Sequence, residues 1–190
     1  MSSPRSATPA DLEPILALHR DFFAEDHYPF REEDSRANLA RLLADPGLGR
    51  VFVLEDGGMV AGYLVLTFGF SLEFGGRDGL VDELYVAPAH RGRGLGTQAL
   101  AAAEEACREL GIRAIHLVVE RYKEDAQALY RRVGFVAHER EVMTKALITP
   151  ALFSRPLPPP SPGEEGEQPE RPRGTPLPGR GMGWSGEGQG

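Results

Sequence analysis

The most informative part of this sequence is the stretch Arg91-Gly92-Arg93-Gly94-Leu95-Gly96. It stands between an apolar run at 81–86 and a helical pattern from Thr97 to Leu110. A strand, a glycine-rich turn and a helix start therefore follow one another. The first N–H groups of such a helix lack partners and carry the positive end of its dipole. The three glycines remove the Cβ atoms that would keep a phosphate from these groups, so the order predicts a phosphate site.

Two common phosphate motifs do not fit this stretch. A P-loop requires G-x-x-x-x-G-K-[ST], and no Lys-Ser or Lys-Thr pair follows a glycine in the chain. A dinucleotide fingerprint requires G-x-G-x-x-G, but counted from Gly92 its last position is Thr97. The acidic residue at a suitable distance, Glu109, lies within the helical pattern. A loop that binds no ligand stays open as a third interpretation, because glycines are common in turns.

Two segments together carry a family resemblance. The glycine stretch matches R/Q-x-x-G-x-G/A directly after a strand that ends Leu-Tyr-Val-Ala-Pro, and the segment 126–135, AQALYRRVGF, follows in the correct order and spacing. These motifs resemble the acyl-CoA signature of the GNAT superfamily of N-acetyltransferases, and the resemblance runs from about Arg5 to Leu147. It implies an α/β fold (α+β mixed sheet), with a central mixed sheet whose strands splay apart and are flanked by helices. It also implies acetyl-CoA as the acetyl donor, with no metal.

The resemblance assigns residues to this cofactor. The backbone amides from Arg91 to Gly96 and the helix dipole would hold the pyrophosphate, and the family adds Thr97. The family also suggests that the backbone beside the glycine loop pairs with the pantetheine arm, which would slot between this strand and the splayed one at 117–119. Arg93 adds positive charge in one interpretation and is only solvated in the other. The expected cofactor-binding residues are Leu84, Val86, Arg91, Gly92, Arg93, Gly94, Gly96 and Thr97.

The acceptor amine requires a base. An alkyl amine has a pKa near 10 and reaches the enzyme as an ammonium, which a carboxylate can attract and deprotonate. Asp82 and Glu83 lie on the strand just before the cofactor-contacting residues. Neighbouring residues of a strand point to opposite faces, so only one ordinarily reaches the cleft, although a bulge could turn Glu83 inward. In related polyamine-type acetyltransferases the base matches Asp82. The alternative for both residues is a surface salt bridge.

Tyr130 is the candidate acid. The corresponding tyrosine of the family donates a proton to the leaving thiolate, and a phenol with a pKa of about 10 suits that role. The alternative is a packed tyrosine whose hydroxyl bonds to the backbone. The amine would attack directly in a ternary complex. One departure concerns Lys123, where many relatives carry Asn; we expect this lysine to face solvent rather than a CoA phosphate.

The acceptor is less visible in the sequence. Acidic and aromatic residues cluster in two groups, one between two helices and one between two strands, where GNAT proteins usually build the acceptor pocket. These residues are Asp26, His27, Tyr28, Phe30, Glu32, Phe70, Glu73, Phe74, Arg77 and Asp78. Acidic groups favour a cationic small amine, although charged loops are often only solvated. The rival functions are acetylation of a protein lysine or amino terminus, and a non-catalytic acyl-CoA-binding module.

Composition sets further bounds. A formal charge of −7 does not suit a nucleic-acid binder. The only cysteine, Cys107, excludes an internal disulfide and falls on an apolar helix stripe. The start of the chain lacks the apolar core of a signal peptide, and no run approaches the 18 residues that span a bilayer, so the cytoplasm is the expected location without membrane contact. A homodimer is an expectation by analogy only.

Two regions are predicted. Residues 1–150 alternate helices and strands and form the N-acetyltransferase-like domain, whereas 154–190 contains nine prolines and nine glycines in 37 residues and predicts a disordered tail. Within the domain, Thr8 caps a first helix and Asp56-Gly57-Gly58 forms a hairpin turn. The other expected elements are a helix at 33–44, strands at 51–54, 59–68, 82–86 and 112–119, a helix at 125–133, and one or two strands within 135–147.

Overall fold

The computed structural model describes residues 3–145 and residue 147. The predicted tail at 154–190 lies outside the described residues. The elements are β1 (Arg5–Ser6), the short helix η1 (Pro9–Asp11), α1 (Leu12–Glu25), α2 (Glu32–Ala44), β2 (Gly49–Asp56), β3 (Met59–Ser71), β4 (Gly76–Val86), the short helix η2 (Pro88–His90), α3 (Leu95–Glu109), β5 (Ile115–Leu117) and α4 (Glu124–Arg132). No helix among these is long and apolar enough to cross a membrane.

The strands form one mixed sheet in the order β1-β2-β3-β4-β5. The pairs from β1 to β4 are antiparallel, whereas β4 and β5 run parallel. Gly57 and Gly58 make the tight turn between β2 and β3, as predicted, and both have a positive φ. Thr8 precedes a helical segment that begins with Pro9, also as predicted. The fold class predicted from the sequence is confirmed.

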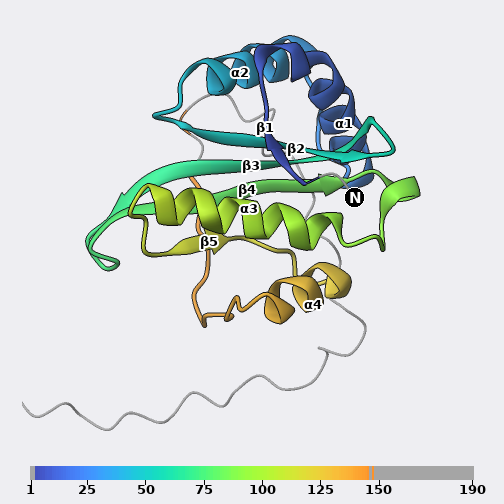
Figure 1. Cartoon of the computed structure of the whole chain (residues 1–190). Helices are drawn as coiled ribbons and strands as arrows, with labels where there is room; N and C mark the ends of the chain where they lie inside the picture. The colour runs from blue at the N-terminus through green and yellow to red at the C-terminus, as the bar shows by residue number, and fades with distance from the viewer. Residues whose placement is uncertain (1–2, 146, 148–190) are drawn as a thin grey trace, which may run out of the picture. The chain divides into compact units, whose positions relative to one another are not determined.

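Helices cover both faces of the sheet (Figure 1), with α1 and α2 on one side and α3 on the other. The alternation of side chains along the strands produces two cores. Val53 and Tyr63 point toward α1 and α2, where they join Ile15 and Leu18. Their neighbours along the strands point toward α3 and pack with its apolar stripe, which includes the buried Cys107. This alternation is what a sheet covered on both faces requires.

The sheet opens at β4. This strand continues to Val86, but it pairs with β5 only where Gly79–Val81 meets Ile115–Leu117. The strand predicted at 112–119 is therefore shorter, and the second edge of β4 beyond Val81 has no strand partner among the described residues. The two parallel strands splay apart at this point, which agrees with the prediction. The open edge leaves backbone groups of β4 available to a ligand.

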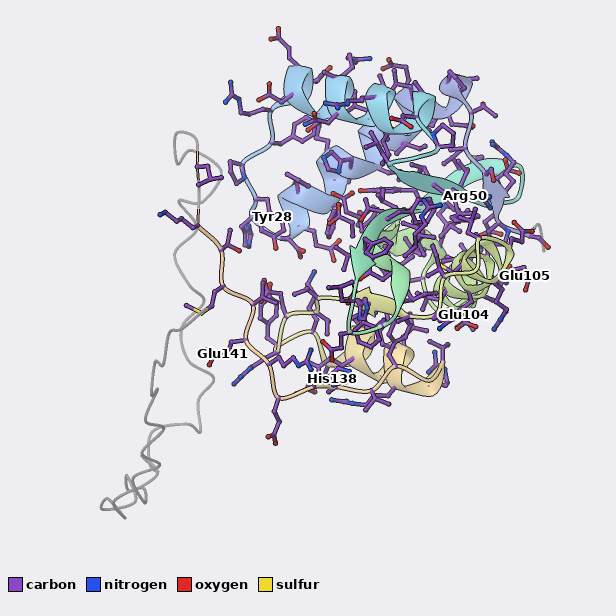
Figure 2. The ribbon with its side chains drawn as sticks, turned by 90° about the vertical axis from the view of Figure 1, so that its left-hand side faces the viewer. Tyr28, Arg50, Glu104, Glu105, His138 and Glu141 are labelled. Atoms are coloured by element: carbon purple, nitrogen blue, oxygen red, sulfur yellow. The ribbon has the colours of Figure 1, made fainter. Side chains whose placement is uncertain are left out.

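The strands predicted within 135–147 are wrong for the described part of that segment, which is irregular. The run His138-Glu139-Arg140-Glu141 interrupts the alternation of apolar and polar residues that a half-buried strand needs. Arg140 instead forms a two-pronged ion pair with Glu73, at 2.8 and 3.0 Å. Figure 2 shows His138 and Glu141 on this segment.

Candidate active site

A β-bulge in β4 brings the two predicted carboxylates together. Across the β3–β4 pair, Glu83 lies opposite Val65 and Val81 lies opposite Leu66, so Asp82 is the extra residue. An extra residue breaks the alternation of side chains along the strand. Asp82 and Glu83 consequently line the same pocket. The sequence left open which of the two reaches the cleft, and in the structure both do.

We call this cavity the small pocket. It has a volume of about 300 Å³ and lies between α1, α2 and the sheet. Its apolar wall combines residues of both helices with β3, and its polar groups come from β4, from α1 and from the start of α2. The lining residues are Ile15, His19, Phe23, Pro29, Arg31, Asp34, Ser35, Asn38, Leu39, Leu42, Tyr63, Val65, Asp82 and Glu83.

Glu83 is held by two side chains that the sequence did not indicate. The Tyr63 hydroxyl donates to Glu83 Oε2 at 2.7 Å, and His19 Nδ1 lies 3.1 Å from the same oxygen. Tyr63 is buried, and this burial, followed by the charge of Glu83, raises the pKa of Tyr63 well above its ordinary value. His19 stands one helical turn after the core residue Ile15. A polar side chain within that apolar stripe was the only available signal for it.

Asp82 has a different environment. Its side chain is exposed to the small pocket and makes no hydrogen bond or ion pair with any described residue. The surrounding protein displaces water from the carboxyl group, and the negative charge of Glu83 lies nearby. Both effects raise the pKa of Asp82, and the displacement of water is the larger of the two. Nearby His19 lowers this pKa. The adjacent carboxylates therefore differ, since one is hydrogen-bonded and the other is free.

A second cavity, the large pocket, has a volume of about 930 Å³. It extends along the open edge of β4, over the glycine loop and the start of α3, and against α4. Seven of the eight predicted cofactor-binding residues line it, and so does Tyr130. The lining residues are Phe22, Glu25, Leu84, Tyr85, Val86, His90, Arg91, Gly92, Gly94, Leu95, Gly96, Thr97, Tyr122, Lys123, Glu124, Asp125, Ala126, Leu129, Tyr130 and Arg132.

The glycine loop serves two purposes. Gly92 and Gly94 have φ values of +74° and +82°, a region that other residues rarely adopt. Gly94 is the N-cap of α3. The helix begins at Leu95, whereas the sequence predicted a start at Thr97. Gly96 also lines the large pocket, and it has a packing role that the sequence did not indicate. A Cβ atom there would stand 3.1 Å from Leu129 Cδ2, so Gly96 lets α3 pack closely against α4.

The two arginines of the loop are both engaged. Arg91 donates to Glu25 Oε2 at 2.6 Å and to the Val86 carbonyl at 2.8 Å, and the hydrogen bond with Glu25 is the main cause of its raised pKa. Arg93 is the predicted cofactor residue that lines neither pocket. Its guanidinium lies 2.5 Å from Asp56 Oδ2, so it pairs with the β2–β3 turn.

Lys123 does not face solvent as expected. Its Nζ donates to Asp26 Oδ2 at 2.5 Å and lies 5.5 Å from the centre of the Phe22 ring. Asp26 is 7% exposed and Lys123 30% exposed. The lysine therefore connects the loop before α4 with the end of α1, and it forms part of the wall of the large pocket.

Tyr130 lies on α4, half-buried, with its ring edge-on to Phe135 at 5.9 Å. Its hydroxyl has no hydrogen-bond partner among the described residues, so the predicted alternative of a hydroxyl bonded to the backbone finds no support there. Burial raises the pKa of Tyr130 above its ordinary value. A neutral phenol thus faces the large pocket.

The two loops predicted to build the acceptor pocket contribute less than expected. None of their ten predicted residues lines either pocket. Glu73 instead pairs with Arg140, and the Phe74 ring lies tilted against the His116 ring, with 4.7 Å between their centres. From the loop between the helices, Pro29 and Arg31 are the residues that reach the small pocket. The polar lining comes mostly from α1, α2 and the bulge, where sequence patterns predict packing rather than chemistry.

The open edge of β4 and the N-terminus of α3 thus line the large pocket, and the paired carboxylates line the small pocket. Residues 13–135 match the model of the Acetyltransferase (GNAT) family, and the chain belongs to that family. It is an N-acetyltransferase. Enzymes of this family use acetyl-CoA.

Two similar enzymes support this placement, and one solved structure is similar to the chain in sequence and fold. The aminoalkylphosphonate N-acetyltransferase of Salmonella typhimurium is 33% identical over 146 residues, which cover 75% of this chain and 90% of the relative. The thialysine N-epsilon-acetyltransferase of Bos taurus is 27% identical over 145 residues, covering 68% and 81%. The crystal structure of the integron cassette protein HFX_CASS3, from the mobile metagenome of Cole Harbour salt marsh, is 33% identical with a TM-score of 0.71, covering 78% and 93%.

Proposed function

We propose that this enzyme transfers the acetyl group of acetyl-CoA to the primary amine of a small molecule, by direct attack within a ternary complex. One observation carries the proposal. Successive residues of a single strand line both cavities, with Asp82 and Glu83 in the small pocket and Leu84 and Val86 in the large one. A donor in the large pocket and an amine in the small pocket would then meet at the bulge.

The large pocket suits acetyl-CoA for physical reasons. The N–H groups of the first turn of α3 have no partners within the helix, and no acidic residue stands in that turn, so they are available to a pyrophosphate. The open edge of β4 offers backbone groups at Leu84 to the amides of the pantetheine arm, and the Val86 carbonyl, which already accepts from Arg91, has a second lone pair for them. Arg91, Gly92, Gly94 and Thr97 complete the proposed phosphate site.

In the small pocket we assign the base to Asp82. Its carboxylate has no protein partner among the described residues, and the displacement of water around it raises its pKa, so it accepts a proton more readily than an ordinary aspartate. Glu83 keeps a fixed negative charge beside it, which attracts the ammonium. Asp82 takes one proton from the ammonium, directly or through water, and leaves a neutral amine that can attack.

The amine nitrogen then attacks the acetyl carbonyl carbon. The carbon–sulfur bond breaks and its electron pair stays on sulfur, which becomes the thiolate of CoA. Tyr130 is the proposed acid: its hydroxyl proton passes to that sulfur. The nitrogen loses its second proton to water as the amide forms, and water returns a proton to the Tyr130 phenolate. The half-buried phenol, with no partner for its hydroxyl in the described part of the chain, is suited to this step.

A small acceptor fits the cavity better than a peptide. A volume of about 300 Å³ is at the low end for small-molecule sites, and the pocket lies between two helices and the sheet rather than along an open groove. Its carboxylates, Asp34, Asp82 and Glu83, outnumber its one arginine, which favours a cation. The similar enzymes named above act on an aminoalkylphosphonate and on thialysine.

The test is the release of CoA thiol from acetyl-CoA in the presence of small amines, free lysine analogues and lysine peptides. We expect turnover with a small amine, and a loss of about a hundredfold or more at pH 7 when Asp82→Ala removes the base. Glu105→Gln, on the outward-facing side of α3, is the matched control (Figure 2). Turnover with peptides alone, or full activity of both Asp82→Ala and Glu83→Ala, would refute this assignment.

A further inference from the structure

His19 projects from α1 toward the bulge and lies against the acidic pair. Its ring stands 4.1 Å from the ring of Phe23, and the side chain is 16% exposed. The Nδ1 atom faces two acceptor oxygens at once, at 3.1 Å from Glu83 Oε2 and 3.2 Å from the Tyr63 hydroxyl. Three elements that are distant in sequence, α1, β3 and β4, therefore meet at one nitrogen atom.

The hydrogen positions follow from these contacts. Tyr63 keeps its proton, because burial and the nearby charge raise the pKa of its hydroxyl. That single proton is donated to Glu83 Oε2 at 2.7 Å. The Tyr63 oxygen can then only accept, and an ionised carboxylate also only accepts. Nδ1 of His19 must therefore carry a hydrogen, which it shares between the two oxygens.

The result is a carboxylate that is fixed in orientation. Oε2 of Glu83 receives two donors, while the neighbouring Asp82 receives none from the described residues. The arginine of the small pocket, Arg31, lies 3.0 Å from Asp34 and is engaged there. His19 is thus the nitrogen donor on the acidic pair.

A structural role alone does not explain this arrangement. The apolar side of α1 supplies Ile15 and Leu18 to the core, and a leucine at position 19 would extend it. Placing a histidine and a glutamate there costs free energy unless their hydrogen bonds are made. The histidine and the glutamate that carry this cost lie beside the groups that we assign to the amine.

We propose that His19 is a positioning residue for acetyl transfer: its Nδ1–H holds Glu83 as an ionised, oriented carboxylate, and this fixed charge holds the ammonium of the acceptor beside Asp82. The inference rests on the proposed function, in which Asp82 takes the proton of the amine. His19 itself gives up no proton in the reaction.

Two substitutions of His19 distinguish the effect of its N–H donor from the effect of its ring. His19→Asn keeps an N–H donor near the place of Nδ1, whereas His19→Leu fills the space without one. We expect His19→Leu to raise the KM of the amine about tenfold, with the KM of acetyl-CoA unchanged. His19→Asn should restore the amine KM to within about threefold.

A second readout requires no substrate. In a ¹⁵N-histidine spectrum, the His19 signals are identified by their loss in His19→Asn, and Nδ1 should be protonated at neutral pH. Glu83→Gln should change the shift of that nitrogen. An unprotonated Nδ1, a His19→Leu enzyme with unchanged amine KM, or a His19→Asn enzyme as impaired as His19→Leu would each overturn the proposal. The spectrum is independent of turnover, so failure of the proposed function would be recognised separately.

Discussion

The Nζ atom of Lys123 lies 2.5 Å from Oδ2 of Asp26, although the two residues are 97 positions apart in the chain. The contact ties the loop before α4 to the end of α1, and the wall of the large pocket includes residues of both elements. Because the carboxylate is buried and the lysine is partly exposed, the two partners do not depend on each other equally.

This asymmetry predicts unequal effects of substitution. Lys123→Met leaves the buried Asp26 carboxylate without its cation, and we expect the free energy of unfolding to fall by about 1–3 kcal/mol. Asp26→Asn should cost less, because Lys123 can turn toward water. The double variant should be more stable than the sum of the two losses predicts. Chemical denaturation of all four proteins measures this, and a greater loss in Asp26→Asn would contradict it.

Glu25 is expected to oppose donor binding. Its carboxylate occupies Arg91 at 2.6 Å, inside the pocket that we assign to a polyanionic cofactor. Glu25→Gln removes a negative charge and frees the guanidinium. Exposed ion pairs are worth about 0.2–1 kcal/mol, so the Kd for CoA should fall by up to about fivefold at low salt, with a smaller change at high salt. Calorimetric titration measures the Kd.

The matched control for that experiment is Glu105→Gln. Glu105 also pairs with an arginine, Arg108, and it lies outside the large pocket on α3. It removes the same charge from the protein without touching Arg91. Equal tightening in both variants would mean that net charge, and not the Arg91–Glu25 pair, governs donor affinity.

Local patterns predicted the parts of the molecule that depend on neighbours in sequence. The hairpin at Gly57-Gly58, the cap at Thr8 and the order of strand, glycine loop and helix each require only a few consecutive residues, and all are present. Local patterns did not indicate that Gly96 is needed for close helix packing, because its close neighbour Leu129 belongs to another helix.

The chemistry of the small pocket could not be predicted from such local patterns. His19 and Glu83 are 64 residues apart, and their contact depends on how α1 packs on the sheet. The bulge at Asp82 depends on strand register, which the residues of β4 alone do not determine. The sequence could therefore propose both carboxylates, but it could not assign them different environments.

The environment of Asp11 predicts how the free energy of unfolding depends on pH. Its carboxylate accepts hydrogen bonds from Arg5 and from the Thr8 backbone, and Arg5 is the main cause of its strongly lowered pKa. The charged form is favoured in the folded state, so its contribution is complete above the unfolded pKa of about 4 and is lost as pH falls below that value.

Asp11→Asn should therefore lower the free energy of unfolding by about 1 kcal/mol between pH 6 and 8, because it removes the charge that Arg5 pairs with; the effect is modest since Arg5 is 42% exposed and its charge is screened. The difference from the unmodified protein should shrink below about pH 4. Denaturation curves at several pH values measure it. A difference that grows toward low pH would have the wrong sign and would exclude this account.

Tyr130→Phe tests the proposed acid. The substitution removes one hydroxyl that has no partner among the described residues, so we expect little change in folding or in the KM of acetyl-CoA. Loss of general acid catalysis should reduce kcat by about a hundredfold or more. Because burial raises the pKa of Tyr130, the phenol stays protonated and kcat should not decline through pH 9 on its account. A decline between pH 8 and 9 that disappears in Tyr130→Phe would show that the phenol ionises earlier than its burial allows.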